Sequence, residues 1–311
     1  MRSGYGGQVA AGLLLDAAFG EPPEAIHPTV LMGRAISTFE RSALALARPE
    51  SRRLAGVALA LSLPTLVFLS TTKLLDAAPV RMRGTIGAAL IFTTLSMRGL
   101  AEAADGVGRA LEERSLDEAR SRVGRFVGRD TGDLSKPEVC RAAVESVAEN
   151  ASDGVVAPML YGVLFGAPGA LAYKAVNTLD SMVGYPKPPH TELGWASARL
   201  DDLANLVPSR ATALLVAAVS GKPLHTLRIA RCYGPLTTSP NAGIAEAAFA
   251  GALGVALGGT NSYAGVLRKG PTLGEGRSPA PADIPRAVRI LRRSCVLLGT
   301  LALLKAVAGR G

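Results

Sequence analysis

Long uncharged segments alternate with short charged segments along this 311-residue chain. A helix needs about 20 mostly apolar residues to cross the hydrocarbon core of a bilayer. The uncharged runs that approach or reach this length lie at 54–72, 154–173 and 247–267. Shorter runs, which suit either membrane helices or buried core helices, lie at 84–97, 211–221 and 294–304. The pattern predicts an all-α fold, a polytopic membrane helical bundle in which residues 1–311 form a single integral membrane domain.

Composition supports a membrane protein. Hydrophobic residues make up 48% of the chain, aromatic residues only 5%, and mean hydropathy is positive, which is unusual for a soluble enzyme. Glycine and proline are frequent, and proline interrupts several apolar runs, as membrane helices tolerate when neighbouring groups satisfy the freed backbone. The alternative is a soluble all-helical protein rich in alanine and leucine.

Charge is spread unevenly along the chain. Residues 98–153 carry nine basic and twelve acidic side chains, a net charge of −3. Because the whole chain has a net charge of +9, the remainder carries +12. We interpret 98–153 as a water-exposed, cytoplasmic helical insertion within the membrane domain. The segment 268–293 carries seven basic residues against two acidic ones, and cytoplasmic loops are enriched in Lys and Arg. Because aromatic residues do not alternate with the basic ones, we expect no nucleic-acid partner.

Several site types are not supported by the sequence. The three cysteines and three histidines are far apart and form no CxxC pair, so neither a disulfide framework nor a protein-held transition metal is expected. His27 is interpreted as a structural hydrogen-bonding residue. The phosphate-binding loop pattern GxxxxGK[ST] is absent from the sequence.

An acidic stripe lies at the start of the run 154–173. Ser135, followed by Pro137 and Glu138, predicts a capped helix start, and the helix would continue through Glu149. Glu145, Glu149 and Asp153 are then spaced i, i+4, i+8 on one face and would repel each other unless a cation bridges them. The pattern indicates a phosphate held through Mg²⁺, which prefers oxygen ligands. A solvated acidic face is the alternative.

Two further polar groups flank the next apolar stretches. One comprises Lys174, Asn177 and Asp180, and the other comprises Arg199, Asp201, Asp202 and Asn205. Ionisable groups at membrane helices are costly and usually mark a site, so we predict that these groups share one polar pocket with the acidic stripe. Asn241 and Glu246 form a fourth group, for which polar contacts between helices are the alternative. Arg129, in a Gly-containing turn, could grip a phosphate or carboxylate.

Six motifs distributed over nearly the whole chain resemble the adenosylcobinamide-phosphate synthase family, of the CobD/CbiB type. They are DAAFGEPPEAIHPTVLMGR, GRDT, RAAVESVAENASDGVVAPMLY, GAPGALAYKAVNTLDSMVGY, GWASARLDDLANLVPSRATALL and SPNAGIAEAAFAGALGVALGG. The resemblance implies a ligase that uses ATP and Mg²⁺ to join adenosylcobyric acid to (R)-1-amino-2-propanol phosphate, or to ethanolamine phosphate, through an amide bond. It implies a multi-pass protein of the cell membrane, in contact with the lipid bilayer, whose active site faces the cytoplasm, and other late cobalamin-pathway enzymes as partners.

The reaction that the resemblance implies makes the polar groups candidates for catalytic, metal-binding and substrate-binding roles. Candidate catalytic residues are Glu145, Glu149, Asp153, Asp180 and Asp202. Candidate metal ligands are Glu149, Asp153, Asp180 and Asp201. Candidate substrate-binding residues are Arg129, Asn150, Lys174, Asn177, Arg199, Asn205 and Asn241. Two other functions fit the same residues: an intramembrane, Mg²⁺-dependent prenyltransferase-like enzyme, and a non-catalytic corrinoid transporter or scaffold.

Overall fold

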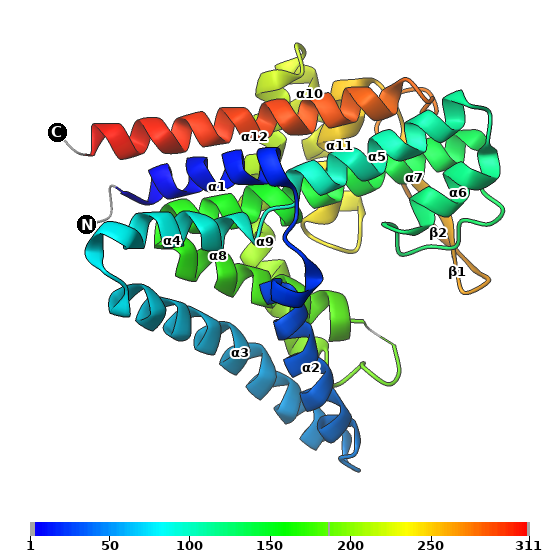
Figure 1. Ribbon diagram of the computed structural model, residues 1–311. Helices are drawn as coiled ribbons and strands as arrows, with labels where there is room; N and C mark the ends of the chain where they lie inside the picture. The colour runs from blue at the N-terminus through cyan, green and yellow to red at the C-terminus, as the bar shows by residue number, and fades with distance from the viewer. Residues whose placement is uncertain (1–3, 186, 310–311) are drawn as a thin grey trace. The chain divides into compact units, whose positions relative to one another are not determined.

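The structure, a computed structural model, describes residues 4–185 and 187–309, apart from the side chain at position 26. Most of the described chain is helical, and one two-stranded sheet is present among these residues (Figure 1). The chain divides into two compact units. Unit 1 comprises Met1–Leu95, Ala157–Asn205 and Gly299–Gly311, and unit 2 comprises Ser96–Val156 and Leu206–Leu298.

Unit 1 is built around one long helix, α8. Its elements are α1 (Tyr5–Phe19), the short 3₁₀ turn Glu24–Ile26, α2 (Pro28–Leu44), α3 (Pro49–Ala77), α4 (Val80–Phe92), α8 (Ala157–Val183), the first part of α9 (Trp195–Val219) and the end of α12 (Asp283–Ala308). Helices α1, α2, α3 and α4 all pack against α8. Close helix contacts use small residues, since a Cβ added at Gly6 would lie 1.9 Å from the backbone oxygen of Ala302.

Helix α8 is kinked near its middle. Gly166 has a φ of 71°, outside the helical region, and Pro168 follows two residues later. Proline lacks the N–H that an α-helix needs, and glycine accepts the positive φ without steric cost. The kink separates an N-terminal part that carries Tyr161 from a C-terminal part that carries Asp180.

Unit 2 combines helices with the sheet. Its elements are α5 (Met97–Glu112), α6 (Leu116–Gly124), α7 (Lys136–Ala151), a π-helical turn (Ser152–Val156), the end of α9, α10 (Pro223–Tyr233), a 3₁₀ turn (Gly234–Leu236), α11 (Ala242–Leu253), β1 (Leu257–Tyr263), β2 (Val266–Leu273) and the start of α12. The predicted start of α7 is confirmed, because Ser135 and Glu138 form a capping box. This cap satisfies backbone N–H groups at the helix start.

The predicted membrane run 247–267 is wrong. Helix α11 ends at Leu253, Gly254 takes the left-handed conformation with a φ of 71°, and β1 begins at Leu257. Strands β1 and β2 form an antiparallel hairpin whose turn is held by Asp130. That carboxylate accepts hydrogen bonds from Ser262 Oγ at 2.6 Å, the Ala264 N–H at 3.0 Å and the Gly265 N–H at 2.8 Å. The run is uncharged but not apolar throughout, and its glycines and hydroxyl and amide side chains favour turns and strands over a helix.

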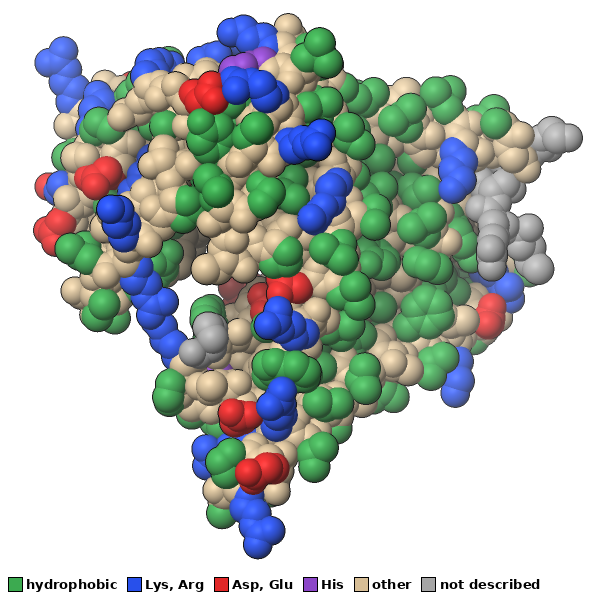
Figure 2. All heavy atoms as spheres, turned by 180° about the vertical axis from the view of Figure 1, so that it is seen from behind, with side chains coloured by type: hydrophobic (Ala, Val, Ile, Leu, Met, Phe, Trp, Pro, Cys, Tyr) green, Lys and Arg blue, Asp and Glu red, His purple; other side chains and the backbone are tan. Residues whose placement is uncertain are grey.

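Among the described residues, four helical stretches are long and apolar enough to cross a membrane. They are Pro49–Ala77, Val80–Glu112, Lys136–Val183 and Trp195–Val219. They contain the predicted runs 54–72, 84–97 and 154–173, and most of 211–221. The run 294–304 lies in α12, which is not one of the four. Many hydrophobic side chains are exposed at the surface seen in Figure 2, interspersed with backbone and charged groups. The prediction of an all-α polytopic membrane protein is confirmed, whereas the cytoplasmic placement of 98–153 stays a prediction.

Candidate functional site

Helices α8 and α9 bring two of the predicted polar groups together within unit 1. We call this set the α8–α9 cluster. It consists of Lys174, Asn177 and Asp180 on α8 and of Arg199, Asp201, Asp202 and Asn205 on α9. Asp201 lies close enough to Asp180 and Asp202 for their charges to interact. Three carboxyl groups from two helices therefore converge, as the sequence predicts for these two groups.

Asp201 is the most elaborately held carboxylate of the α8–α9 cluster. Asn205 Nδ2 donates to Asp201 Oδ2 at 2.9 Å, and Asn177 lies within hydrogen-bonding reach of the same carboxylate. Tyr173 in turn donates its hydroxyl to Asn205 Oδ1 at 2.9 Å, and both of these residues are buried. A chain of hydrogen bonds from α8 to α9 thus fixes the orientation of Asp201, because the Asn205 amide accepts through its oxygen and donates through its nitrogen.

Arg199 is the exposed cation of the α8–α9 cluster, whereas Lys174 is partly buried like the aspartates. Arg199 lies 3.7 Å from Asp202, with 69% of the arginine side chain and 30% of the aspartate side chain exposed. An exposed pair of this kind contributes little to stability, so both groups can exchange partners for a charged ligand. Lys174 lies close to His27.

His27 acts as the N-cap of α2, which confirms its interpretation as a structural residue. Its Nδ1 accepts a hydrogen bond from the Thr29 N–H at 3.2 Å. Burial lowers the pKa of His27, Glu21 opposes this effect, and the charge of Lys174 adds to it. A lowered pKa favours the neutral ring, which is the form that can accept the capping hydrogen bond at Nδ1.

In unit 2 the first acidic residue of the predicted stripe is neutralised by protein groups. Glu145, 4% exposed, pairs with Arg129 and lies 3.5 Å from Arg141, and its Oε1 accepts the Gly258 N–H at 2.6 Å. Arg129 also donates to Asn261 Oδ1 at 2.7 Å, while Arg141 donates to the carbonyls of Gly258 and, at 3.1 Å, Thr260. We call these contacts the hairpin clasp, because they tie α7 and the 129 turn to β1.

The other members of the stripe have different surroundings. Glu149 is exposed, and Asp153 is partly buried in the π-helical turn, which follows the wider i→i+5 pattern instead of the α-helical one. Asn150 donates to the carbonyl of Ser146 at 2.9 Å, one turn back on α7. The stripe therefore does not present three equivalent carboxylates.

Glu246, on α11, belongs to the fourth polar group of the sequence and has no predicted role. Burial raises its pKa well above the usual value for glutamate, and the charges of Glu145 and Glu149 raise it further. Asn241, at the start of α11, accepts hydrogen bonds from Ser209 Oγ at 3.2 Å and from Arg210 Nη1 at 2.8 Å. These contacts link two helices through polar groups, which is the alternative interpretation given for this group. The predicted substrate-binding role of Asn241 stays a prediction.

The predicted four-ligand metal set falls in both units. Glu149 and Asp153 belong to unit 2, and Asp180 and Asp201 to unit 1. Across the described ranges, no group of three or more His, Cys, Asp or Glu side chains could hold a metal ion. Mg²⁺, however, is usually held by one or two carboxylates together with substrate phosphates. Asp180 and Asp201 fit that requirement, since Asp201 Oδ1 is buried and lacks a well-formed hydrogen bond within the described residues. The single pocket for all groups stays a prediction.

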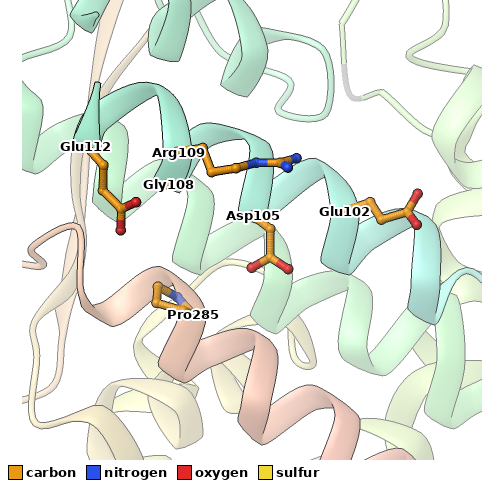
Figure 3. A pocket seen from close by; sticks show the side chains of 6 residues that line it. All are labelled: Glu102, Asp105, Gly108, Arg109, Glu112 and Pro285. Carbon is orange, nitrogen blue, oxygen red and sulfur yellow. The ribbon is translucent and has the colours of Figure 1, made fainter. Parts of the chain in front are cut away.

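Two cavities differ sharply in chemistry. One, of about 560 Å³, is lined in unit 2 by Glu102, Asp105, Gly108, Arg109, Glu112 and Pro285. Figure 3 shows Asp105 and Glu112 projecting from α5 toward the helix that carries Pro285, while Arg109 and Glu102 extend sideways along α5. These groups are already paired in part, since Arg292 lies 3.6 Å from Asp105. The second cavity, of about 400 Å³, is apolar and lies in unit 1 beside the α8–α9 cluster.

Sequence reasoning missed residues that act across long separations. Arg141 appears in the sequence only as one cation of an amphipathic helix, and nothing local links it to Gly258, 117 residues later. Tyr173 precedes Asn205 by 32 residues. The signal available for both was their place within motifs that carry the family resemblance, not their spacing.

Four membrane-length helical stretches and a converging set of carboxylates, amides and cations define a polytopic helical membrane protein with a polar site at its helices. A family profile described as "CobD/Cbib protein" matches residues 9–291. The chain belongs to this CobD/CbiB family, which takes part in cobalamin biosynthesis.

Relatives of high coverage agree with this assignment. "Cobalamin biosynthesis protein CobD" of Geobacter metallireducens is 44% identical over 307 residues, covering 96% of this chain and 95% of the relative. The protein of the same name from Synechocystis sp. is 43% identical, covering 86% and 81%. That of Halalkalibacterium halodurans is 39% identical, covering 97% and 96%. No solved structure matches the chain.

Proposed function

We propose that this protein catalyses ATP-dependent amide bond formation between adenosylcobyric acid and (R)-1-amino-2-propanol phosphate or ethanolamine phosphate, giving adenosylcobinamide phosphate. Membership of the CobD/CbiB family supports the pathway. The convergence of Asp180, Asp201 and Asp202 on α8 and α9 is the observation that supports an active site at these helices.

The reaction requires charge handling of the kind that this cluster offers. A carboxylate is a poor acyl donor, so a propionate of the corrinoid must first take a phosphoryl or adenylyl group from ATP. The ammonium of the amino alcohol must lose a proton before its nitrogen attacks the activated carbonyl carbon. The amide bond then forms as the bond to phosphate or AMP breaks. Positioning and charge stabilisation account for most catalysis of such phosphoryl chemistry.

The surroundings of each aspartate support different roles. Asp180 and Asp201 would hold Mg²⁺, which supplies charge neutralisation to bound phosphates. Asn205 and Tyr173 keep the Asp201 carboxylate in place through the hydrogen bonds described above. The Asp202 side chain is 30% exposed and lies 3.7 Å from Arg199, so it would suit the role of proton acceptor for the ammonium group.

The remaining charged groups would have binding or positioning roles. Lys174 and Arg199 would bind phosphate groups of the substrates, with Arg199 releasing Asp202 as it does so. Glu145, Arg129 and Arg141 would position the hairpin, because their charges are already satisfied by one another. The site would face the cytoplasm, where ATP is available.

The test is product analysis with matched variants. Purified protein is incubated with adenosylcobyric acid, aminopropanol phosphate and ATP, and the corrinoid and nucleotide products are identified by mass spectrometry. We expect amide product with stoichiometric ADP or AMP. We expect Asp201→Asn and Asp180→Asn to lower turnover about 100-fold or more, as loss of a group that stabilises transition-state charge does.

Asp117→Asn is the matched control, since Asp117 lies on α6 with its side chain 93% exposed. Its turnover should equal that of the unchanged protein. Near-normal turnover in both cluster variants would remove the α8–α9 cluster from the mechanism. Corrinoid binding without nucleotide consumption would favour a transporter or scaffold, and turnover of a prenyl diphosphate would favour the prenyltransferase-like alternative.

A further inference from the structure

A groove in unit 1 is lined by side chains without free polar groups. Its volume is about 400 Å³, at the lower end of the range of about 300 to 1,000 Å³ for ligand pockets. It lies among α3, α8 and α9, and its main lining residues are Pro64, Phe68, Tyr161, Phe165, Ala172 and Leu203. All three helices belong to stretches long and apolar enough to cross a membrane.

Aromatic rings form one wall of the groove. The ring centroids of Tyr161 and Tyr173 lie 5.1 Å apart, and those of Tyr161 and Phe165 lie 6.3 Å apart. Both tyrosine hydroxyls are engaged elsewhere, since Tyr161 donates to the Ala204 carbonyl at 3.0 Å and Tyr173 donates to Asn205. The wall therefore offers ring faces, which suit an apolar chain and reject a polar ligand.

An arginine and a tryptophan mark the polar boundary above the groove. The Arg53 guanidinium lies 4.2 Å from the centroid of the Trp195 ring, and these residues stand near the N-terminal ends of α3 and α9. Tryptophan is enriched at membrane–water interfaces, and arginine extends toward lipid headgroups. At a rise of about 1.5 Å per residue, Leu200 lies about 8 Å and Pro64 about 16 Å further along their helices.

These depths run the groove from within one leaflet to about the bilayer midplane, since half of the hydrocarbon core is about 15 Å thick and Phe68, 15 residues after Arg53, lies about 22 Å along α3. The rim is open to that layer, because Phe165 is 49% and Leu203 65% exposed. We infer that the groove binds one acyl chain of a membrane phospholipid, whose phosphate lies near Arg53. The site adjoins the α8–α9 cluster through Tyr173, so the bound chain would also buttress the hydrogen bonds that orient Asp201.

Photo-cross-linking in vesicles tests this inference. The purified full chain is reconstituted into phosphatidylcholine vesicles that contain a trace of phospholipid with a diazirine on one acyl chain. After irradiation, labelled residues are located by mass spectrometry. We expect labels on groove residues such as Phe68, Phe165 and Leu203. Ala172→Phe should lower these labels about tenfold, because a phenyl ring takes the space of several methylenes.

Ala58→Phe is the matched control, since Ala58 is an exposed residue of α3 that does not line the groove. It should leave groove labelling unchanged. If Ala172→Phe fails to fold, Ala204→Phe takes its place, because Ala204 also lines the groove.

Two results would overturn the inference. Equal labelling of groove residues in the unchanged protein and in a folded groove-filling variant would mean that lipid does not occupy the groove. Loss of labelling on addition of adenosylcobyric acid alone would assign the groove to the corrinoid instead. The inference does not depend on the proposed ligase activity, since labelling is measured without ATP or amino alcohol.

Discussion

The carboxyl group of Glu246 faces two other acidic residues, Glu145 and Glu149, inside unit 2. Burial first, and then these charges, raise the pKa of Glu246. A raised carboxyl pKa gives a contribution to stability that is fully present below the unfolded value of about 4.3 and is lost as pH rises toward the folded value. We therefore expect Glu246→Gln to raise the free energy of unfolding at pH 8 by about 1 kcal/mol or more and to change it little near pH 4.

Thermal unfolding of purified protein in detergent, followed over this pH range, measures the effect. Glu275→Gln is a control of opposite sign. Hydrogen bonds from Arg228 first, and then from Tyr233, lower the pKa of Glu275, so its contribution is present above the unfolded value and is lost in acid. A stabilisation by Glu246→Gln that does not depend on pH would contradict the assigned cause.

A second residue-scale prediction concerns the carbonyl of Ala204. Pro208 has no N–H to donate to the carbonyl four residues earlier, and Tyr161 supplies the donor at 3.0 Å. We expect Tyr161→Phe to lower the free energy of unfolding by about 1 kcal/mol, because the carbonyl loses its partner. In a Pro208→Ala background, where the backbone N–H is restored, the same change should cost much less. A double-mutant cycle by denaturant unfolding measures this coupling, and strict additivity would contradict it.

At the scale of residues, the sequence predicts which side chains lie side by side within one helix, because helix geometry fixes their spacing. Asp201 and Asn205 are four residues apart on α9, so helix geometry places them on one face, where they form a hydrogen bond. Asn205 also meets Tyr173 from another helix, and no local rule contains that pairing. Contacts within one helix follow from spacing, whereas contacts between helices depend on how the helices pack.

Among the elements, the β1–β2 hairpin contacts one buried carboxylate, that of Glu145. Glu145 is paired with Arg129 and Arg141, whose side chains are only 11% exposed. Glu145→Ala would leave both guanidinium groups without their anion, a loss that typically costs about 3–5 kcal/mol when a buried pair is broken. We expect the amides of Leu257–Tyr263 and Val266–Leu273 to exchange hydrogen much faster in this variant.

Hydrogen exchange read out by mass spectrometry is the measurement, with Glu102→Ala as the matched control. Glu102 is paired with Arg98 on one exposed helix face, and surface pairs contribute about 0–1 kcal/mol. The control should leave hairpin exchange unchanged. Unaltered protection of both strands in Glu145→Ala would show that the hairpin does not need the clasp.

Element prediction succeeded where the pattern was specific. The capping box at Ser135 identified the start of α7, and the run 54–72 identified α3. The prediction of a membrane helix at 247–267 is wrong, because a run without charged residues need not be apolar throughout. Gly254, Gly258 and Gly259 all adopt positive φ there, a conformation that ends a helix.

For the whole molecule, the testable property is the side of the membrane that the polar segments face. Residues 98–153 and 268–293 belong to unit 2, and both were predicted to face the cytoplasm. Of the three cysteines, Cys232 is exposed while Cys140 and Cys295 are buried. In a Cys232→Ser background we expect Ser121→Cys and Ser278→Cys to react with a membrane-impermeant maleimide in inside-out vesicles only. Both positions are exposed, so reaction from the outside of intact cells would contradict the placement.

Oxygen transfer from the acid to the nucleotide tests the proposed chemistry most directly. Adenosylcobyric acid labelled with ¹⁸O in the reacting carboxylate is incubated with the purified protein, aminopropanol phosphate and ATP, and the products are analysed by mass spectrometry. We predict that the amide retains one ¹⁸O and that the other appears in inorganic phosphate or in AMP, because the activated acid loses that oxygen with its leaving group. Amide product without ¹⁸O in either species, or no amide product from folded protein, would contradict ATP-dependent activation of the acid.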